Sequence, residues 1–500
     1  MRCFRLALAM SLVGASACSL LLDTDALQKA GTAGASGAAG SSGAGAGGGT
    51  GDLDAGRDAG AACSTDVDCQ PFETVEGCTR YECKDKICAP PRAHTGLGVV
   101  SVAGDAETAD QAEDIGYPSL VADGTDLVLA FWKRNGTTSN IVIRKYDERP
   151  EISPTSADLS AISSNRFDSV SSSPGMIIRG IPRRIRLLAA AKPTGAAVTG
   201  MYQLDIDLAN LRVSPMQPTK MDLGVTGFDV SPRGPAPRLL PSGLGEPVGM
   251  WIQQGKLFYF DANSTGDVYS AKRVIGFSPL AATAGVHAAL ETTDLGSTDD
   301  QGETELWTRN SNVLTTLIGD IPSARRRGVA TTATAEGTVP INFVIWSFER
   351  AGAASLLYAV SSCDGMQCPA VGAPAGTGGT LAATSPAAAS ARVTGATADR
   401  DMAAVFQVTA SDPTRPSIVT TALLGGITRV TTTQDGGPAL AATAMNPATF
   451  FVTLTNAPAV NVGPTSVAIT PGGLMMVAWV ERGATQALLK TRRFQVKTCP

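Results

Sequence analysis

Histidine, aromatic side chains and charge are all scarce in this 500-residue sequence. His94 and His287 are the only histidines, which argues against a histidine-based metal site and a Ser/His catalytic triad. Charged residues make up 17% of the chain and the formal net charge is −5, so the basic surface that nucleic-acid binding requires is missing. P-loop, G-x-G-x-x-G and G-x-S-x-G motifs are also absent. The sequence therefore predicts no nucleic-acid partner, no cofactor and no metal.

Long apolar runs are lacking too, and the one apolar run at the N-terminus has the layout of a secretory signal. Arg2 and Arg5 precede the apolar residues 6–13, and small residues lead from there to Cys18. The run is shorter than the roughly 18 residues that a membrane-spanning helix needs. Removal of the two arginines with the signal would bring the net charge from −5 to −7 (−5 − 2).

Residues Ala15-Ser16-Ala17-Cys18 resemble the lipobox of bacterial lipoproteins, although the family prefers leucine where this chain has Ala15. The resemblance implies that residues 1–17 are a signal peptide and that acyl chains such as palmitate anchor Cys18 in a membrane. Ser19, rather than Asp, implies the outer membrane or cell surface. The alternative is an ordinary A-x-A cleavage site at the same bond, which would leave Cys18 as a free thiol.

Residues 18–62 are predicted to be a disordered tether behind this anchor. Positions 31–60 contain twelve glycines and eight alanines and almost no large apolar residue. Such a segment cannot bury enough surface to offset its conformational entropy. A random coil of this length separates its ends by roughly 35–40 Å, which would hold the folded part away from a lipid surface.

Residues 63–93 form a small cysteine module with the spacing C-x5-C-x8-C-x4-C-x4-C. A segment this short needs covalent staples because its core is too small. The pattern resembles short Cys-rich units in surface proteins of myxobacteria and their relatives. The module is either a passive spacer or a ligand-binding knot, and its spacing argues against zinc.

An even number of cysteines in an exported chain indicates disulfides. Eight remain when Cys3 leaves with the signal and Cys18 is lipidated: Cys63, Cys69, Cys78, Cys83, Cys88, Cys363, Cys368 and Cys499. Cys363 and Cys368 are close enough to pair with each other. The module holds five, so we expect one of them, with Cys88 favoured, to pair with Cys499.

Residues 94–500 show strand signals and few helix signals. A unit recurs in which a strand, a polar turn and an apolar strand closed by an aromatic residue follow one another. The aromatic markers are Trp132, Tyr202, Trp251, Trp307, Trp346, Phe406, Phe451 and Trp479. The apolar strands at 127–132, 343–346 and 474–479 indicate burial on both faces, as stacked blades provide. We predict an all-β protein with a β-propeller of about seven blades, and tandem β-sandwiches as the alternative.

A propeller must close its ring, and the last strand-like segment offers the means. Residues 487–496 are expected to pair beside the first strand of the body near residues 97–103. The predicted bond of Cys499 to the module would then staple the two ends where they meet.

Three clusters of charged residues could carry a function, and each also has a simpler structural explanation. Asp205 and Asp207 lie two apart on one strand face, which indicates exposed strand polarity rather than an acid pair. The acidic stretch around Asp294–Glu305 departs from a calcium loop and is expected to be solvated. Two arginine groups invite comparison with sialidase-type propellers, but no Ser-x-Asp-x-Gly-x-x-Trp box is present, and exposed turns and strand edges are the favoured explanation: Arg179, Arg183, Arg184 and Arg186, and Arg325, Arg326 and Arg327.

These patterns favour a lipid-anchored, extracytoplasmic protein whose propeller binds an unknown protein or polysaccharide without catalysis. No catalytic residue is assigned. The alternative is an exported carbohydrate-active hydrolase, sialidase-like or glycosidase-like, with carboxylates in the central channel. Two carboxylates about 5–10 Å apart in a cleft would favour the hydrolase.

Overall fold

A computed structural model describes 37 strands and their shorter connections between residues 60 and 499. The chain divides into two compact units, Met1–Gly51 and Asp52–Pro500. The predicted signal peptide, Cys18 and the predicted tether up to residue 59 lie outside the described residues, as do residues 64–68 and 70–78 and the longer loops of the body. No helix in the described ranges is long and apolar enough to cross a membrane.

The body consists of seven antiparallel sheets of four or five strands each, which follow one another along the chain. Blade 1 contains β7 (Asp114–Ile115), β8 (Ser119–Asp123), β9 (Asp126–Asn135), β10 (Thr138–Tyr146) and β11 (Thr155–Asp158). Blade 2 contains β12 (Phe167–Val170), β13 (Gly175–Arg179), β14 (Arg184–Pro193), β15 (Gly200–Asp207) and β16 (Thr219–Lys220). Blade 3 contains β17 (Arg238–Leu240), β18 (Val248–Gln253), β19 (Lys256–Phe260) and β20 (Thr265–Tyr269).

The remaining four sheets repeat this order of strands. Blade 4 contains β21 (Arg273–Leu280), β22 (His287–Thr293), β23 (Glu303–Thr308) and β24 (Val313–Ile318). Blade 5 contains β25 (Ala324–Thr334), β26 (Ile341–Arg350), β27 (Ala353–Ser362) and β28 (Ala370–Gly376). Blade 6 contains β29 (Ala383–Ala391), β30 (Arg400–Thr409), β31 (Ile418–Ile427) and β34 (Phe450–Thr455), with the hairpin β32 (Arg429–Gln434) and β33 (Gly437–Ala442) inserted before β34. Blade 7 contains β35 (Asn461–Ile469), β36 (Leu474–Arg482), β37 (Ala487–Cys499), β5 (Gly96–Ser101) and β6 (Glu107–Ala112).

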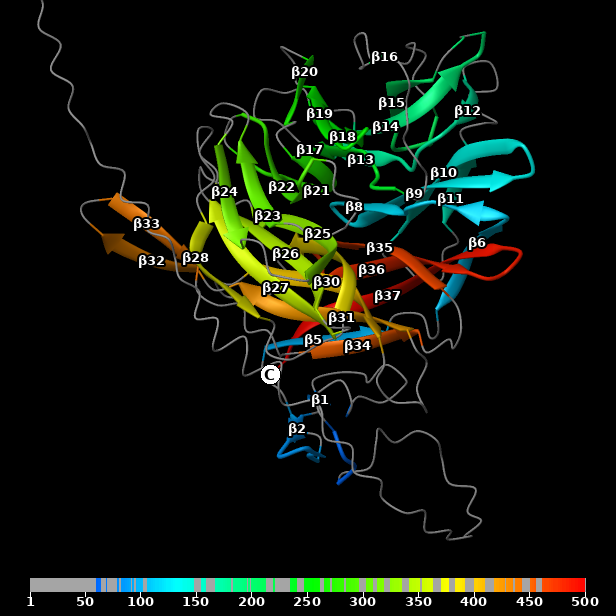
Figure 1. Cartoon of the computed structure of the whole chain (residues 1–500). Coiled ribbons are helices and arrows are strands. Elements are labelled where there is room, and N and C mark those ends of the chain that lie inside the picture. Colours follow the sequence, from blue (N-terminus) through cyan, green and yellow to red (C-terminus); the bar gives the residue numbers. More distant parts are fainter. Residues whose placement is uncertain are drawn as a thin grey trace, which may run out of the picture. The chain divides into compact units, whose positions relative to one another are not determined.

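The first strand of each sheet touches the first strand of the next, and this chain of neighbours closes on itself. It runs β8, β13, β17, β21, β25, β29, β35 and back to β8. These strands lie nearest the middle of the body in Figure 1, and the fourth strands lie outermost. The body is therefore a seven-bladed β-propeller, and the prediction of about seven blades is confirmed.

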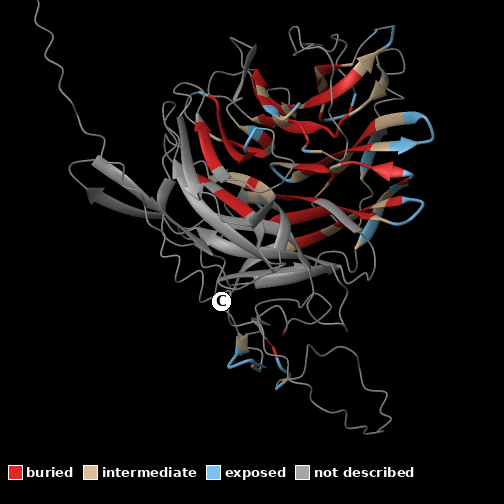
Figure 2. Ribbon diagram, in the orientation of Figure 1, coloured by how far each residue is buried: buried red, intermediate tan, exposed pale blue. Residues whose placement is uncertain are grey.

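The second strands are buried on both faces, as their continuous apolar runs predict. In β9, the six residues Leu127–Trp132 are at most 4% exposed. Alternate side chains enter two different cores: Leu127, Leu129 and Phe131 pack with residues of β36, while Val128 and Ala130 pack with residues of β14 and β15. Figure 2 shows this burial in the middle of the sheets, with exposed residues at the turns.

The aromatic markers fall less regularly than the blades do. Trp132, Trp251, Trp346, Phe406 and Trp479 lie on second strands, as expected. Tyr202 and Trp307 instead lie on the third strands β15 and β23, and Phe451 on the fourth strand β34. Every blade contains at least one marker, and blade 6 contains two, Phe406 and Phe451, so the eight markers approximate the number of blades.

The ring closes through the pairing that the sequence predicts. Val496 of β37 lies opposite Val99 of β5, and Ala487 at the other end of β37 lies opposite Ala112 of β6. The N-terminal and C-terminal ends of the body thus share blade 7. Pairing of distant segments in one sheet makes opening of the ring cost a whole set of backbone hydrogen bonds.

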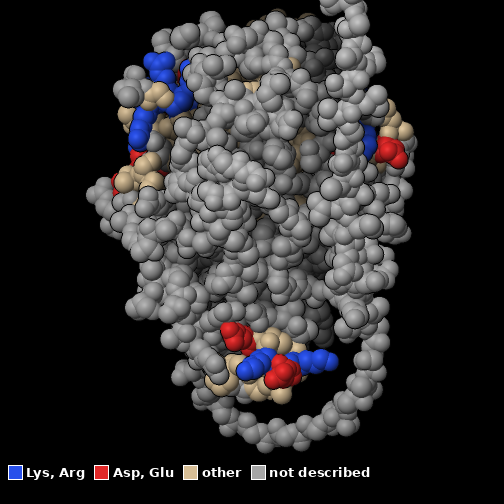
Figure 3. Space-filling model, turned by 90° about the vertical axis from the view of Figure 1, so that its left-hand side faces the viewer, with Lys and Arg blue, Asp and Glu red and all other residues tan. Residues whose placement is uncertain are grey.

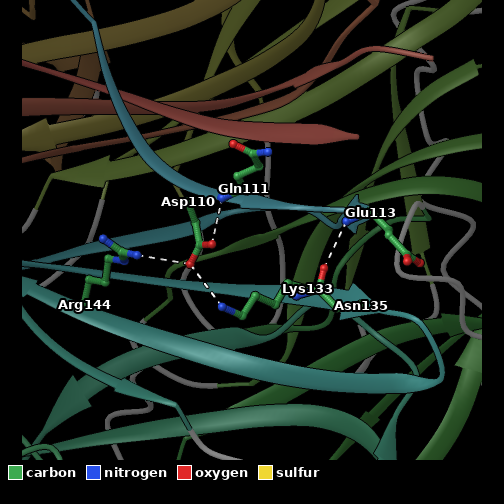
Figure 4. A network of polar contacts seen from close by, with 6 residues as sticks. All are labelled: Asp110, Gln111, Glu113, Lys133, Asn135 and Arg144. Atoms are coloured by element: carbon green, nitrogen blue, oxygen red, sulfur yellow. Dashed lines mark hydrogen bonds and ion pairs between the residues drawn. The ribbon is translucent and has the colours of Figure 1, made fainter. Parts of the chain in front are cut away.

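An ionic cluster reinforces the contact between blade 7 and blade 1. Oδ2 of Asp110 on β6 lies 3.0 Å from Nη2 of Arg144 on β10 and 3.3 Å from Nζ of Lys133 on β9. Its Oδ1 accepts the backbone N–H of Gln111 at 2.7 Å. Figure 4 shows the carboxylate between the two cations, with Glu113 turned away from them.

The cysteine module contains two short sheets, β1 (Thr79–Arg80) with β4 (Arg92–Ala93), and β2 (Cys83–Lys84) with β3 (Ile87–Cys88). Asp85 and Lys86 at the β2–β3 turn have φ values of 53° and 64°. Positive φ at both central residues is characteristic of the tight type I′ hairpin turn. The turn is exposed and carries charges of both signs, which the described part of the module displays in Figure 3.

Two disulfides staple the module, Cys63 to Cys83 and Cys69 to Cys88. Because Cys83 and Cys88 lie opposite each other in the hairpin, the two bonds fasten the preceding segment against it at neighbouring points. The preference for a Cys88–Cys499 bond is therefore wrong, since Cys69 lies nearby and takes Cys88. Cys78, Cys363 and Cys368 lie outside the described residues, and Cys499 is the last residue of β37.

Candidate functional site

The first strands of six of the seven blades are interrupted. In blade 1 the strand breaks between β7 and β8, and in blade 2 it breaks between β12 and β13. In blades 4, 5, 6 and 7 the pairing of first and second strands shifts at a bulge. Bulges turn backbone and side chains out of the regular ladder and are frequent beside functional sites. The interruptions surround the axis of the ring.

A glycine brings two of these first strands unusually close together. A Cβ atom placed on Gly175, the first residue of β13, would lie 2.3 Å from the carbonyl oxygen of Pro237. Only glycine permits this approach. It seats Pro237 and the following Arg238, which begins β17, against blade 2.

Four polar side chains from four blades form what we call the central mouth: Tyr117, Arg238, Glu291 and Arg482. Tyr117 lies in the break before β8, Arg238 at the start of β17, Glu291 on β22 and Arg482 at the end of β36. Tyr117 interacts electrostatically with the other three. Blade 4 lies across the ring from blades 1 and 7, so Glu291 can interact with Tyr117 only near the axis.

Two members of the central mouth are bonded to the protein itself. Arg482 donates from Nη2 to the carbonyl oxygen of Ile115 at 2.7 Å, and its Nε lies 3.8 Å from Asp114. Glu291 is 4% exposed and accepts the backbone N–H of Gly328 at 3.0 Å. Both hold first strands in place around the mouth.

The other two members are hydrogen-bond donors without a protein acceptor. Among the described residues, neither the guanidinium of Arg238 nor the hydroxyl of Tyr117 has a hydrogen bond or ion pair, although the backbone N–H of Tyr117 donates to Ser173 at 2.6 Å. Both side chains are deeply enclosed and yet keep part of their surface open. The polar groups of both side chains are therefore available to a ligand although protein surrounds them.

Burial sets the protonation of these two groups. It raises the pKa of the Tyr117 phenol, an effect that Arg238 and Arg482 oppose and Glu291 increases. Burial also lowers the pKa of Arg238, and Tyr117 opposes that shift. At neutral pH the phenol keeps its proton, so it serves as a donor and is a poor nucleophile.

The described buried carboxylates are engaged in structural contacts. Thr292 donates to Glu305 at 2.7 Å, and Lys272 lies 3.0 Å from its other oxygen. Trp479 donates its indole N–H to Glu481 at 3.0 Å. Asp114 and Glu291 have the partners given above, and these four are the acidic residues buried in the described part of the chain. The paired, available carboxylates of a glycosidase are not found among them.

Comparison with known proteins adds a fold likeness and nothing closer. No protein-family model and no curated protein matches the sequence. The chain is similar in fold to a leech intramolecular trans-sialidase, with 10% identity, a TM-score of 0.36 and coverage of 77% of this chain and 68% of that one. It is also similar to the NanB sialidase of Streptococcus pneumoniae, with 9% identity, a TM-score of 0.35 and coverage of 79% and 70%. The SapL1 lectin follows at 12% identity, a TM-score of 0.32 and coverage of 64% and 96%.

Residues from two of the charged clusters identified in the sequence form an ion pair with each other. Arg186 and Asp205 lie opposite each other on β14 and β15 and form a two-fold contact, with N–O distances of 2.6 and 2.8 Å. Asp207 accepts the backbone N–H of Ala209 at 2.7 Å and so stabilises a turn. This first arginine group lies at the end of β13 opposite to Tyr117, away from the central mouth. The reading of Asp205 as exposed polarity is corrected to an ion pair.

The remaining candidate residues lie in different environments. Glu305 is buried within β23, so the expectation of a fully solvated acidic loop is wrong for this residue. Asp294 is exposed, and Asp299 and Asp300 lie outside the described residues. Arg325 and Arg326 lie at the start of β25, the strand end equivalent to Arg238, and their side chains are not described.

The module offers no free metal ligands among its described cysteines. The Sγ atoms of Cys63, Cys69 and Cys88 lie within 4.8 Å of one another. All three form disulfides, which removes the thiolates that a metal requires.

Sequence reasoning did not single out Tyr117, Arg238, Glu291 or Arg482. They are separated by up to 365 positions (482 − 117) and share no motif. One signal was present: Tyr117-Pro118 and Pro237-Arg238 each lie at the start of a repeat, where chains enter the first strand of a blade.

Proposed function

We propose that this chain is a lipid-anchored surface protein whose propeller binds an extracellular ligand at the central mouth without catalysis. Cys18 carries the anchor, residues 19–62 form the tether, and the module at residues 63–93 serves as a spacer or collar that follows the tether in sequence. The anchor and its place at the outer membrane or cell surface rest on the sequence pattern.

The observation that supports a binding role is which polar groups at the central mouth already have partners within the protein. Arg238 and Tyr117 present donors without acceptors, while each described buried carboxylate is held by the protein's own groups. A site with open donors and engaged carboxylates is equipped to hold an acceptor-rich ligand and poorly equipped for general acid–base catalysis.

Binding is tested with the purified full-length protein in detergent on an array of neutral and acidic polysaccharides, with reducing sugars measured in parallel. We expect retention of at least one polysaccharide without release of sugars. Steady release of reducing ends would favour the glycosidase alternative, and no retention on any polysaccharide would refute a polysaccharide-binding role.

The anchor is tested separately by replacing Cys18 with Ala in a bacterial host that processes lipoproteins. The wild-type protein should incorporate labelled palmitate and fractionate with membranes, and the variant should be unlabelled and soluble. Soluble, unlabelled protein in both cases would refute the anchor and leave the binding role untouched.

A further inference from the structure

We propose that the central mouth recognises the carboxylate of an acidic sugar, with Arg238 as its cation and the hydroxyl of Tyr117 as a second donor. The proposal deepens the binding role above and rests on it. It names the chemical class of the ligand and the two residues that would contact it.

The first step is the lack of any acceptor for Arg238. A guanidinium has five N–H donors, and a buried one is costly unless those donors and the charge are satisfied. In the described part of the protein Arg238 has no carboxylate partner, whereas Arg186, Arg144 and Arg482 each lie beside an aspartate. Arg238 differs from them in being surrounded by protein without such a partner while part of its surface stays accessible.

The second step is the rigidity of its position. The close approach at Gly175 fixes the backbone of Pro237 and Arg238 against β13. The following residue, Leu239, is buried in a core with Ile177 and Trp251. Because side chains alternate along a strand, Leu239 in the core turns Arg238 to the other face. Ordered donors bind with less entropic cost than flexible surface arginines.

The third step is the charge and polarity of the surroundings. A carboxylate is the anion that matches a single guanidinium in charge and geometry, and the neutral phenol adds one hydrogen bond. Glu291 across the mouth disfavours a more highly charged anion such as a phosphate monoester. Ser173, which is fully buried at the break in blade 2, accepts the backbone N–H of Tyr117 and so fixes the position of that residue.

The surroundings also favour a sugar over a protein partner. Protein interfaces bury aromatic and apolar side chains at their centre. In the described part of the chain the large apolar residues that are exposed are Ile87 and Leu295, and neither belongs to the central mouth. Hydroxyl and guanidinium groups suit a hydroxylated, carboxylated ring.

The experiment is calorimetric titration of the full-length protein in detergent with galacturonate, with polygalacturonate and with neutral galactose and galactan. The variants are Arg238→Gln, Arg238→Lys and Tyr117→Phe, and Arg212→Gln is the matched control because Arg212 is an exposed arginine far from the mouth in the fold. Urea unfolding midpoints establish that each variant is folded.

We expect acidic ligands to bind and neutral ones not to bind. Arg238→Gln should raise Kd at least about tenfold, Arg238→Lys and Tyr117→Phe should raise it about three- to tenfold, and Arg212→Gln should leave it unchanged. Equal affinity for the monomer and for each polymer residue would assign recognition to the free sugar acid. Markedly tighter binding of the polymer would assign it to a chain within an extended groove.

Unchanged affinity in Arg238→Gln would overturn the inference, and so would preferential binding of galactan. In both cases the propeller still binds a polysaccharide, so the proposed function stands. Failure to bind any saccharide would overturn the inference together with the polysaccharide-binding role on which it rests.

Discussion

Asp110 on β6 and Arg144 on β10 form an ion pair at 3.0 Å between the last blade of the propeller and the first. The two residues are 34 positions apart, yet β6 belongs to the sheet that the C-terminal strand β37 completes. Lys133 shares the same carboxylate oxygen at 3.3 Å. The contact therefore ties the closing strands to the neighbouring blade at the point where the ring is joined.

Replacement of Asp110 with Asn should destabilise the propeller by about 1–2 kcal/mol, because two partly buried cations lose their common partner. The measurement is the urea midpoint of the full-length protein. Glu113→Gln is the matched control, since Glu113 is exposed on the same segment and its backbone N–H, rather than its side chain, donates to Asn135 at 3.1 Å. Equal midpoints for the two variants would show that the cluster does not hold the ring closed.

Replacement of Gly175 with Ala should cost about 1–3 kcal/mol, because the added methyl would meet backbone atoms of Pro237 that cannot rotate away. It should also weaken ligand binding, since Arg238 would be displaced. Gly483→Ala is the control, where the nearest atom to a new Cβ is Gln486 O at 3.4 Å and no left-handed φ is required. Wild-type stability and affinity in Gly175→Ala would contradict the role given to this close approach.

The Arg186–Asp205 pair should contribute stability that depends on pH. Burial pushes the pKa of Asp205 upward, but the hydrogen bond and charge of Arg186, together with Arg179 and Arg184, outweigh it and lower the pKa. A carboxylate with a lowered folded-state pKa stabilises the protein above its unfolded pKa of about 3.9, and that contribution is lost as the pH falls through the folded value.

Asp205→Asn should therefore unfold at lower urea than the wild type at pH 7, by about 1 kcal/mol or less because the pair is partly exposed to solvent. The difference should shrink progressively below pH 4. Equilibrium urea curves between pH 3 and pH 7 provide the measurement. A difference that grows toward acid would show that the sign of the shift is wrong.

Peptide mapping without reduction should recover Cys63 joined to Cys83 and Cys69 joined to Cys88. With these four assigned, the cysteine count predicts that Cys363 pairs with Cys368 and leaves Cys78 as the module's partner for Cys499. A Cys78–Cys499 peptide would covalently join the module to the closing strand β37. A free Cys499 thiol in the purified protein would exclude that bond.

The fold was predictable to a useful degree because its cause is local and repeated. Runs such as Leu127–Trp132 and Leu474–Trp479 must be buried on both faces, and only a stack of sheets provides that for every unit. The strand at residues 487–496 has no pairing partner close to it in sequence. Closure of the ring supplies one, the first strand of the body. In contrast, the repeat placed Tyr202, Trp307 and Phe451 on second strands, and this placement is wrong. Spacing along the chain does not distinguish a second strand from a third or a fourth.

The sequence by itself predicted the repeat and the ring closure that the structure shows, since both depend on composition or periodicity within a few tens of residues. The signal and the tether ahead of the module stay predictions. The sequence did not determine the pairing of Cys88 or the central mouth. Those depend on which residues the closed ring brings together, and Tyr117, Arg238, Glu291 and Arg482 come from four separate blades. Only the tertiary structure decided that Arg186 would pair with Asp205 while Arg238 would have no acidic partner among the described residues. The physical reason is that charge pairing and burial are set by distances in space, which the chain fixes only when its last strand joins its first.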